Sequence, residues 1–272
     1  MMDRRLTPAT ARVAHVSLRG KVGAVAWTEG QVLAVVVPLV DLLRDPGGAR
    51  ERQLLLGEGF TVVDREQGHA FGFARKDGYC GWLPEASLGE TPAPTHWVAS
   101  TGTHLYSEPR SASKELGALS LGARVEVLRR VDKWAETPVG YVPASHLRGI
   151  GEWLDDPVAV AEAFAGTPYL WGGNSRAGID CSGLVQATHL ACGVTLPGDA
   201  DLQAGAGHEI SGSQALRRGD LLFWKGHVAL VVGDGRIIHA NGFTMSVAYE
   251  GLEDAIARIA AVEGPVIARR RV

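Results

Sequence analysis

The sequence predicts an α+β domain at the C-terminal end of the chain, preceded by two small all-β barrels. Short apolar runs broken by Gly and Pro fill the first half of the chain, and two stretches of that half show the same order of similar segments. From Gly151 onward, two helix patterns are followed by a series of strand patterns. A chain of 272 residues has room for two or three domains. We therefore expect domains at 1–92, 93–150 and 151–272.

The composition is that of a soluble globular protein, with 46% hydrophobic residues, 21% charged residues and a net charge of -3. This charge gives no basic footprint for nucleic acid or an acidic membrane. The first twenty residues lack an apolar segment, and no stretch of eighteen apolar residues occurs, so we expect neither a secretory signal nor a membrane helix. Three scattered cysteines fit neither a disulfide framework nor a zinc site. We expect a reduced, cytoplasmic protein without metal or cofactor.

The two similar stretches predict the barrels. Residues 42–88 contain LLRDP, ERQLLLGEGFTVV and GYCGWLPEASL, and residues 105–147 contain LYSEP, ELGALSLGARVEVL and VGYVPASHL in the same order. Each resembles a bacterial SH3 domain, a small five-strand barrel, and the alternative is a generic barrel without a binding role. The linker TPAPT (91–95) separates them. The sequence assigns no role to residues 1–36, but RVAHVSLRGKVGAVAW and QVLAVVVPLV are strand-like stretches that could extend the first barrel.

The C-terminal region has clear helix boundaries. Asp156 and Pro157 are suited to the N-cap and first position of a helix that Gly166 ends. Asp180 is suited to the N-cap of a second helix, which ends at Gly193. Strand patterns follow at GDLLFW (219–224), HVALVVG (227–233) and RIIHA (236–240).

Cys181, directly after the predicted N-cap Asp180, is a candidate nucleophile. A free thiol has a pKa of about 8.5, and the amides and dipole of a helix N-terminus favour its thiolate. The same amides can bind the oxyanion of an acyl-transfer reaction. The alternative, a buried small hydrophobic residue, is the one we assign to Cys80 and Cys192.

A cysteine nucleophile needs a base and a group that orients the base. His227 and His239 lie in adjacent strand patterns joined by Gly233-Asp234-Gly235. A two-residue turn would pair Leu230 with His239 and put the histidines on opposite faces. A three-residue turn, with Gly235 left-handed, would bring them onto one face, and the chemistry favours it. The alternative is that each histidine serves only a local hydrogen bond.

With these residues in place, the chain resembles the NlpC/P60 cysteine peptidases over residues 153–268. The motifs are TPYLWGG (167–173), DCSGLVQ (180–186), LRRGDLLFW (216–224) and HVALVVG followed by HA. The resemblance implies a papain-like fold that cuts bacterial wall peptides between D-glutamate and a diamino acid. It implies Cys181 as nucleophile, His227 as base and His239 as its orienting partner. It also implies a set of supporting residues, with Tyr169 at the oxyanion hole and Asp180, Ser182 and Trp171 at the substrate.

The order of domains is similar to that of the γ-D-glutamyl-L-diamino-acid endopeptidases of wall-peptide recycling. The resemblance implies a free murein peptide such as L-Ala-γ-D-Glu-diaminopimelate as substrate, with no nucleic acid or membrane partner. It implies that Glu51, Tyr79 and Asp199 hold the N-terminal ammonium. The alternatives are a solvated surface acid for Glu51 and barrel core for Tyr79. Gly198 departs from the family pattern, which has arginine there, and the oligomeric state is left open.

The sequence is also compatible with two other functions. The first is an amidase or acyltransferase on the same fold, because a thioester can be attacked by acceptors other than water. The second is a non-catalytic wall-peptide binding protein, against which the combination of Cys181, His227, His239 and Tyr169 argues.

Overall fold

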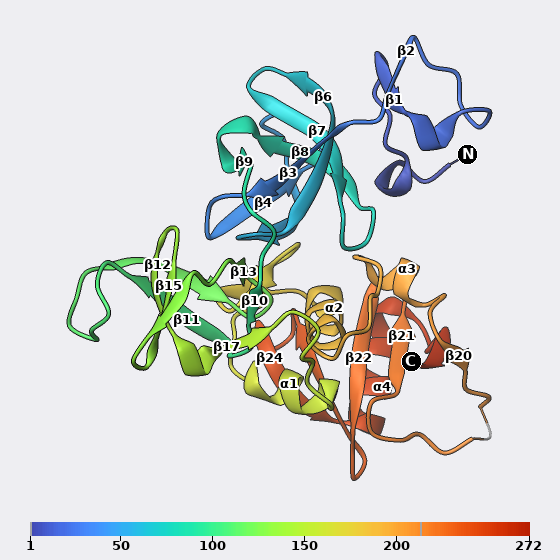
Figure 1. Ribbon diagram of the computed structural model, residues 1–272. Coiled ribbons are helices and arrows are strands. Elements are labelled where there is room, and N and C mark those ends of the chain that lie inside the picture. The colour runs from blue at the N-terminus through green and yellow to red at the C-terminus, as the bar shows by residue number, and fades with distance from the viewer. Residues whose placement is uncertain (1, 213) are drawn as a thin grey trace. The chain divides into compact units, whose positions relative to one another are not determined.

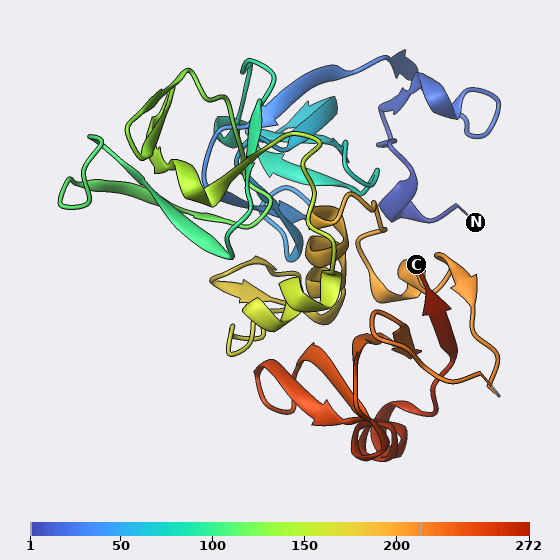
Figure 2. The ribbon, with the colours of Figure 1, turned by 60° about the horizontal axis from the view of Figure 1, so that its bottom comes forward.

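The computed structural model describes residues 2–212 and 214–272 and contains two compact units, Met1–Glu152 and Trp153–Val272 (Figures 1 and 2). The first unit consists largely of β-sheets, and the second is an α+β unit, as predicted. Within the described residues, no helix has the length and apolar character needed to cross a membrane.

The first barrel is a seven-stranded sheet in the order β5-β4-β8-β7-β6-β3-β9. Its core includes Val35, Leu42, Phe60 and Leu83. The strand-like stretch QVLAV forms β3 and joins this sheet, as predicted. The strands are β3 (Gln31–Val35), β4 (Leu39–Leu43), β5 (Arg50–Leu55), β6 (Gly59–Glu66), β7 (His69–Ala74), β8 (Cys80–Pro84) and β9 (Leu88–Gly89), with a 3-10 turn η3 (Glu85–Ser87) before the last.

The second barrel repeats the pairing of the first. Its five-stranded sheet runs β12-β11-β16-β15-β14, and its three-stranded sheet runs β13-β10-β17. Strand β3 pairs with β6 and β9, and β10 pairs in the same way with β13 and β17. The two barrels therefore share the internal repeat that the sequence predicted. The elements are β10 (His96–Val98), β11 (Gly102–Tyr106), β12 (Glu115–Ser120), β13 (Arg124–Val125), β14 (Arg129–Val131), β15 (Trp134–Thr137), β16 (Gly140–Pro143), η4 (Ala144–His146) and β17 (Leu147–Gly149).

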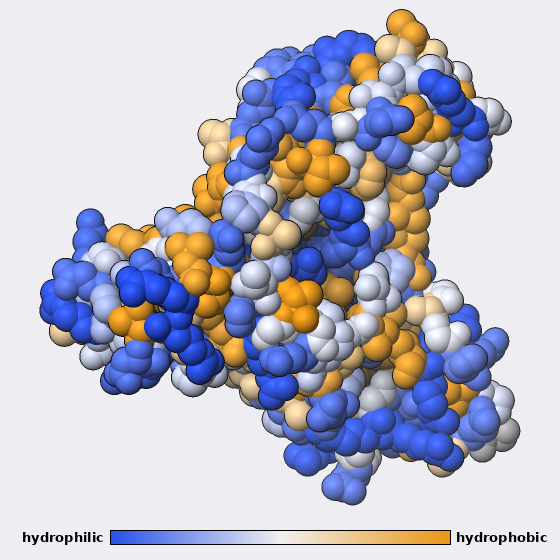
Figure 3. Space-filling model, viewed as in Figure 1, coloured by the Kyte–Doolittle hydropathy of each residue, from blue (hydrophilic) through white to orange (hydrophobic). Residues whose placement is uncertain are grey.

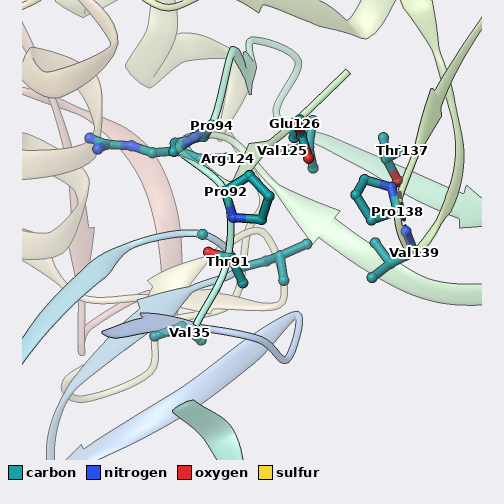
Figure 4. A pocket seen from close by; sticks show the side chains of 12 residues that line it. Val35, Thr91, Pro92, Pro94, Arg124, Val125, Glu126, Thr137, Pro138 and Val139 are labelled. Atoms are coloured by element: carbon teal, nitrogen blue, oxygen red, sulfur yellow. Dashed lines mark hydrogen bonds between the residues drawn. The ribbon is translucent and has the colours of Figure 1, made fainter. Parts of the chain in front are cut away.

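The two barrels meet inside the first unit. The amide of Arg124 donates to the Leu56 carbonyl (2.8 Å), and a Cβ on Gly57 would collide with the Arg124 carbonyl. A cavity of about 90 Å³ lies beside this contact, with Val35 on one side and the linker residue Pro92 and Pro138 on the others (Figure 4). The far end of the second barrel, at the left of Figure 3, is mostly hydrophilic.

The N-terminal segment differs from the prediction. The stretch RVAHVSLRGKVGAVAW does not extend the barrel sheet, because β1 (Val13–His15) and β2 (Ala26–Thr28) pair with each other in a separate parallel sheet. Two 3-10 turns, η1 (Arg4–Leu6) and η2 (Val16–Leu18), complete the segment. Ion pairs from Arg12 to Asp64 and Glu66 attach it to β6 instead.

The second unit is built on a six-stranded sheet in the order β20-β25-β21-β22-β23-β24. Helices α1 and α2 pack on each other and on β22 and β23. Helix α4 places Ala255 and Ile259 in a core with residues of β21 to β23. The strands are β18 (Asn174–Ser175), β19 (Gly178–Ile179), β20 (His208–Glu209), β21 (Leu221–Trp224), β22 (His227–Gly233), β23 (Arg236–Asn241), β24 (Ser246–Gly251) and β25 (Ala268–Arg271), and the helices are α1 (Pro157–Ala163), α2 (Cys181–Ala191), α3 (Ala200–Gln203) and α4 (Leu252–Glu263).

The predicted helix signals are confirmed. Asp156 caps α1 by accepting from the Val158 amide at 2.8 Å, and Pro157 is its first residue. Asp180 caps α2, and Gly193 follows its end with a φ of 80°. The three predicted strands correspond to β21, β22 and β23, whereas β24, α4 and β25 lie beyond the elements that the sequence predicted.

Candidate active site

Cys181 is the first residue of α2, at the position the sequence predicts. Asp180 Oδ1 accepts hydrogen bonds from the Gly183 amide (2.6 Å) and the Ser182 hydroxyl (3.0 Å). Asp180 Oδ2 accepts from the Gly172 amide (2.9 Å), which ties the preceding loop to the helix. One buried carboxylate therefore fixes both the helix start and the glycine loop around Cys181.

Two glycines allow the loop and the helix to approach closely. A Cβ on Gly183 would lie 2.5 Å from the Gly173 carbonyl oxygen, and a Cβ on Gly173 would lie 2.6 Å from the Gly178 carbonyl oxygen. Any larger residue at either position would push the loop away from the first turn of α2. The glycines of TPYLWGG and DCSGLVQ thus hold Cys181 in its setting.

The other two cysteines are poor nucleophiles. Burial raises the pKa of Cys80 to about 12, and burial with the nearby Asp156 and Asp155 raises the pKa of Cys192 to about 11. Both are therefore thiols at neutral pH, consistent with the predicted structural role. All three cysteines are free of disulfides.

The two histidines meet as predicted. His227 Nε2 and His239 Nδ1 are 2.8 Å apart, and the rings are arranged edge to face with centroids 5.1 Å apart. Cys181 Sγ lies 3.9 Å from the carbonyl oxygen of Gly226, the residue before His227. Since Nε2 of His227 is taken by His239, Nδ1 is the nitrogen left for the thiol.

The turn that aligns the histidines differs in detail from the prediction. Gly233 pairs with Arg236, so the turn has two residues, Asp234 and Gly235, with φ of 50° and 67°. The register then shifts between Val231 and Gly233. This bulge produces the pairing of Leu230 with Ile238 that a three-residue turn would have produced. The predicted face was right, and the predicted turn was wrong because a bulge supplied the extra residue.

The hydrogen-bond chain continues to two residues that the sequence reasoning missed. His239 Nε2 lies 3.1 Å from Glu250 Oε2. Arg258 donates to both oxygens of Glu250, from Nε to Oε1 (2.8 Å) and from Nη2 to Oε2 (2.7 Å). The strand pattern of residues 246–251 and the helix pattern of 252–263 could have revealed them, because a hairpin would set Glu250 beside the strand of His239.

The electrostatics keep both rings neutral at pH 7. Burial lowers the pKa of His227 to about 3, with smaller contributions from repulsion by a protonated His239 and by Arg258. Burial lowers the pKa of His239 to about 4, against the opposing effect of Glu250. Arg258 holds the pKa of Glu250 below its usual range, so this carboxylate is charged.

Tyr169 and Trp171 lie in the loop before Cys181. Burial, and then the charge of Cys181, raises the pKa of Tyr169, so its hydroxyl stays a donor. The Tyr169 amide donates to the Met245 carbonyl at 2.9 Å, which fixes the loop to the β23–β24 turn. Trp171 is 69% exposed, a suitable state for a residue that contacts a ligand.

The remaining substrate residues predicted in this unit have structural partners. Asp180 and Ser182 bond each other, and Gln203 Nε2 donates to the Ser182 carbonyl (2.9 Å). Gln203 thereby ties α3, whose N-cap is Asp199, to the start of α2. Gly198 precedes Asp199. Substrate contact by Asp180, Ser182, Asp199 and Trp171 stays a prediction.

The other two predicted contacts lie in the first unit. Both oxygens of Glu51 bond the guanidinium of Arg4 in the N-terminal segment, with one Nη1–Oε2 distance of 2.9 Å. Tyr79 is 3% exposed and packs in the first barrel's core. Their proposed role with Asp199 stays a prediction. Among the described residues, no group of three or more His, Cys, Asp or Glu could hold a metal ion.

Comparison with known proteins gives matches in both units. The NlpC/P60 family matches residues 166–261, and the bacterial dipeptidyl-peptidase Sh3 domain matches residues 42–88. A γ-D-glutamyl-L-lysine dipeptidyl-peptidase of Bacillus cereus is 30% identical over 234 residues, covering 70% of this chain and 67% of the relative. The protein of the same name from Bacillus subtilis is 30% identical over 221 residues, covering 70% and 72%.

A crystal structure gives the same fold. An NlpC/P60 family protein from Bacillus cereus superposes with a TM-score of 0.76 at 23% identity, covering 89% of this chain and 99% of the other. The match confirms SH3-like sheets followed by the papain-like unit. With the sequence similarity to the two dipeptidyl-peptidases, it leads to one conclusion: this chain belongs to the NlpC/P60 family and is a cysteine peptidase.

Proposed function

We propose that this peptidase hydrolyses the bond between the γ-carboxyl of D-glutamate and a diamino acid, with Cys181 as the nucleophile. The observation that carries the proposal is the arrangement of Cys181 at a capped helix start beside the hydrogen-bonded pair His227 and His239. The two relatives named γ-D-glutamyl-L-lysine dipeptidyl-peptidase support the choice of bond.

The reaction needs two proton transfers at His227. The ring takes the Cys181 proton as sulfur attacks the γ-carbonyl carbon, and it then returns that proton to the leaving amine. This leaves a thioester between Cys181 and the dipeptide. His227 next takes a proton from water as the oxygen of that water attacks the thioester, and it passes the proton to sulfur as the γ-carboxylic acid leaves, which then ionises to the carboxylate.

The oxyanion of each tetrahedral intermediate needs donors. In this proposal the first donors are the amides of Cys181 and Ser182, at the end of α2 where the helix dipole is positive, since the Gly183 amide bonds Asp180. The Tyr169 hydroxyl, which its raised pKa keeps protonated, is the second donor in this proposal. His239 holds the ring of His227 through the Nε2–Nδ1 bond and is an orienting group.

The finer features of the substrate are also part of the proposal. We infer a free peptide with an N-terminal L-alanine, such as L-Ala-γ-D-Glu-diaminopimelate, used in wall-peptide recycling in the cytoplasm. Glu51, Tyr79 and Asp199 would hold the ammonium, because a desolvated charged donor needs charged or aromatic partners. In that case Arg4, which now bonds Glu51, competes with the ammonium for this carboxylate.

Mass spectrometry of the purified protein with synthetic peptides tests the proposal. We expect L-Ala-γ-D-Glu and the free diamino acid as products, with diaminopimelate and L-lysine peptides compared side by side. The α-linked isomer should not be cut, and the N-acetylated peptide should be cut at least tenfold more slowly. Cys181→Ala is the control. Equal cleavage of the α- and γ-linked peptides contradicts the bond assignment, and products formed only with an added amine point to acyl transfer.

A further inference from the structure

The chain of hydrogen bonds behind His227 ends on a group that can only accept. Arg258 donates two hydrogen bonds to Glu250 and lowers its pKa, so Glu250 is an ionised carboxylate. The ring nitrogen of His239 that faces Glu250 Oε2 at 3.1 Å must therefore carry the hydrogen. This single requirement determines the protonation of every group between Glu250 and Cys181.

The position of the hydrogen on His239 determines the position of the hydrogen on His227. A neutral His239 with its hydrogen on Nε2 has a lone pair on Nδ1. The 2.8 Å contact with His227 Nε2 then needs a hydrogen on that nitrogen of His227. A neutral His227 with its hydrogen on Nε2 has a lone pair on Nδ1, the nitrogen that remains for the thiol. In the opposite arrangement, His227 Nδ1 would carry a hydrogen and could not take another.

We propose that Glu250 is a positioning residue of this peptidase: by accepting from His239 Nε2, it selects the tautomer in which His227 Nδ1 is ready to take the Cys181 proton. The proposal rests on the function proposed above. Arg258 has a supporting part, because two bonds to the carboxylate hold it in place and keep it from taking the proton of His239.

The charge of Glu250 acts in the same direction as its geometry. The charged groups that act on the two rings are Glu250 on β24 and Arg258 on α4. Glu263, also on α4, acts on Arg258, and the charges of Cys181, Asp180 and Glu263 act on Tyr169. Arg258 disfavours a proton on His227, whereas Glu250 favours it. Glu250 therefore stabilises the imidazolium that forms when Cys181 ionises, and its loss would leave Arg258 uncompensated.

Burial separates this residue from direct contact with a substrate. The His239 side chain is fully buried and the Glu250 side chain is 19% exposed, and the ring of His239 stands between Glu250 and His227. A change at Glu250 should therefore alter kcat and leave KM nearly unchanged.

The first test needs no variant. Nitrogen-15 NMR of the histidine rings distinguishes the two neutral tautomers, and we expect the hydrogen on Nε2 of both His227 and His239 at pH 7. A hydrogen on Nδ1 of either neutral ring would overturn the proposal. This measurement stands even if a Glu250 variant fails to fold.

The second test compares Glu250→Gln with Glu253→Gln, an exposed glutamate three residues along the chain. We expect kcat to fall about ten- to a hundredfold in Glu250→Gln, with KM within about twofold. Glu253→Gln should match the wild type. In a His239→Asn background, Glu250→Gln should cost less than about threefold, because the ring through which it acts is gone. An equal loss in both backgrounds would mean that Glu250 only supports the fold.

The third test measures alkylation of Cys181 by iodoacetamide as a function of pH, which needs no peptide substrate. Without Glu250 the imidazolium is less stable, so the pH at which Cys181 becomes reactive should rise in Glu250→Gln. Cys80 and Cys192, with pKa values of about 12 and 11, are references within the same protein and should not shift. An unchanged Cys181 profile overturns the proposal. A shifted profile in a protein that cuts no γ-glutamyl peptide refutes the proposed substrate alone.

Discussion

Two arginine–carboxylate pairs lie on opposite sides of β22 in the six-stranded sheet, with the same geometry and different third partners. Arg258 holds Glu250 through two bonds of 2.8 and 2.7 Å, and Arg271 holds Asp220 through two bonds of 2.7 and 2.8 Å. Glu250 also meets the ring of His239, whereas Asp220 also accepts from the Arg217 backbone amide at 2.7 Å. The carboxylate of the Glu250 pair contacts a ring that can be protonated, whereas the carboxylate of the Asp220 pair contacts a backbone amide.

The third partner decides whether an arginine–carboxylate pair contributes to catalysis or to the stability of the fold. Asp220 precedes β21, its side chain is 1% exposed, and Arg271 belongs to β25, so this pair ties the last strand to the sheet. A backbone amide cannot change its protonation, and nothing in that pair can transmit charge to Cys181. The Glu250 pair can do so through two rings.

The largest expected effect on kcat comes from changing the two histidines that are linked to Glu250. His227→Asn should lower kcat by about a thousandfold, because a general base and acid is lost. His239→Asn should cost only about tenfold, since an amide oxygen can accept the hydrogen bond from His227 Nε2. Steady-state kinetics on the γ-linked tripeptide measure both. Equal losses would erase the distinction between the proton carrier and its orienting partner.

The second-largest expected effect concerns the Arg271–Asp220 pair, whose loss should lower the stability of the fold without changing catalysis. Arg271→Gln removes two charge-assisted bonds from the buried Asp220. We expect the free energy of unfolding to fall by about 2 kcal/mol, because hydrogen bonds to charged groups contribute about 1.5–3 kcal/mol. Urea denaturation gives the value, and kcat of the folded protein should match the wild type. A tenfold loss of kcat without a change in stability would show that both pairs serve the reaction.

The smallest expected effect is the response to acid. The folded-state pKa values of His227 and His239, about 3 and 4, lie below the usual value of 6.5. The unfolded chain therefore binds more protons in this window, and stability is lost as the pH falls from about 6.5 toward 4. His239→Asn should flatten this decline by on the order of 1 kcal/mol.

Arg271→Gln is the matched variant for this pH dependence and should decline in parallel with the wild type. His189, whose pKa burial also lowers, leaves a residual slope in every variant. Denaturation midpoints between pH 4 and 7 measure all three proteins. If His239→Asn and the wild type had identical slopes, His239 would not be neutral in the folded protein.

The sequence predicted the elements whose boundaries depend on local chemistry. Asp156, Asp180 and Gly193 mark helix ends by capping and by left-handed backbone, and both effects are readable from neighbouring residues. The face shared by His227 and His239 was also predictable, because strand alternation and the chemistry together allow one register. The bulge near Val232 was not, since several backbone solutions give the same register.

Contacts between segments that are distant in the chain could not be predicted from the sequence. Arg258 and Glu250 are eight residues apart on elements that the pattern analysis did not reach, and His239 joins them only because β23 and β24 pair. The strand-like stretch 12–27 has the right alternation for the barrel, but it forms a separate parallel pair. Alternation indicates that a segment is a strand and does not indicate its partner.

In the proposed reaction, Cys181 carries the dipeptide as a thioester. Rapid acid quench of the wild-type enzyme with L-Ala-γ-D-Glu-diaminopimelate, followed by intact-protein and peptide mass spectrometry, tests it directly. We expect an added mass equal to L-Ala-D-Glu minus one water, located on the peptide that contains Cys181. An adduct on Cys80 or Cys192, or turnover by Cys181→Ala, would contradict it.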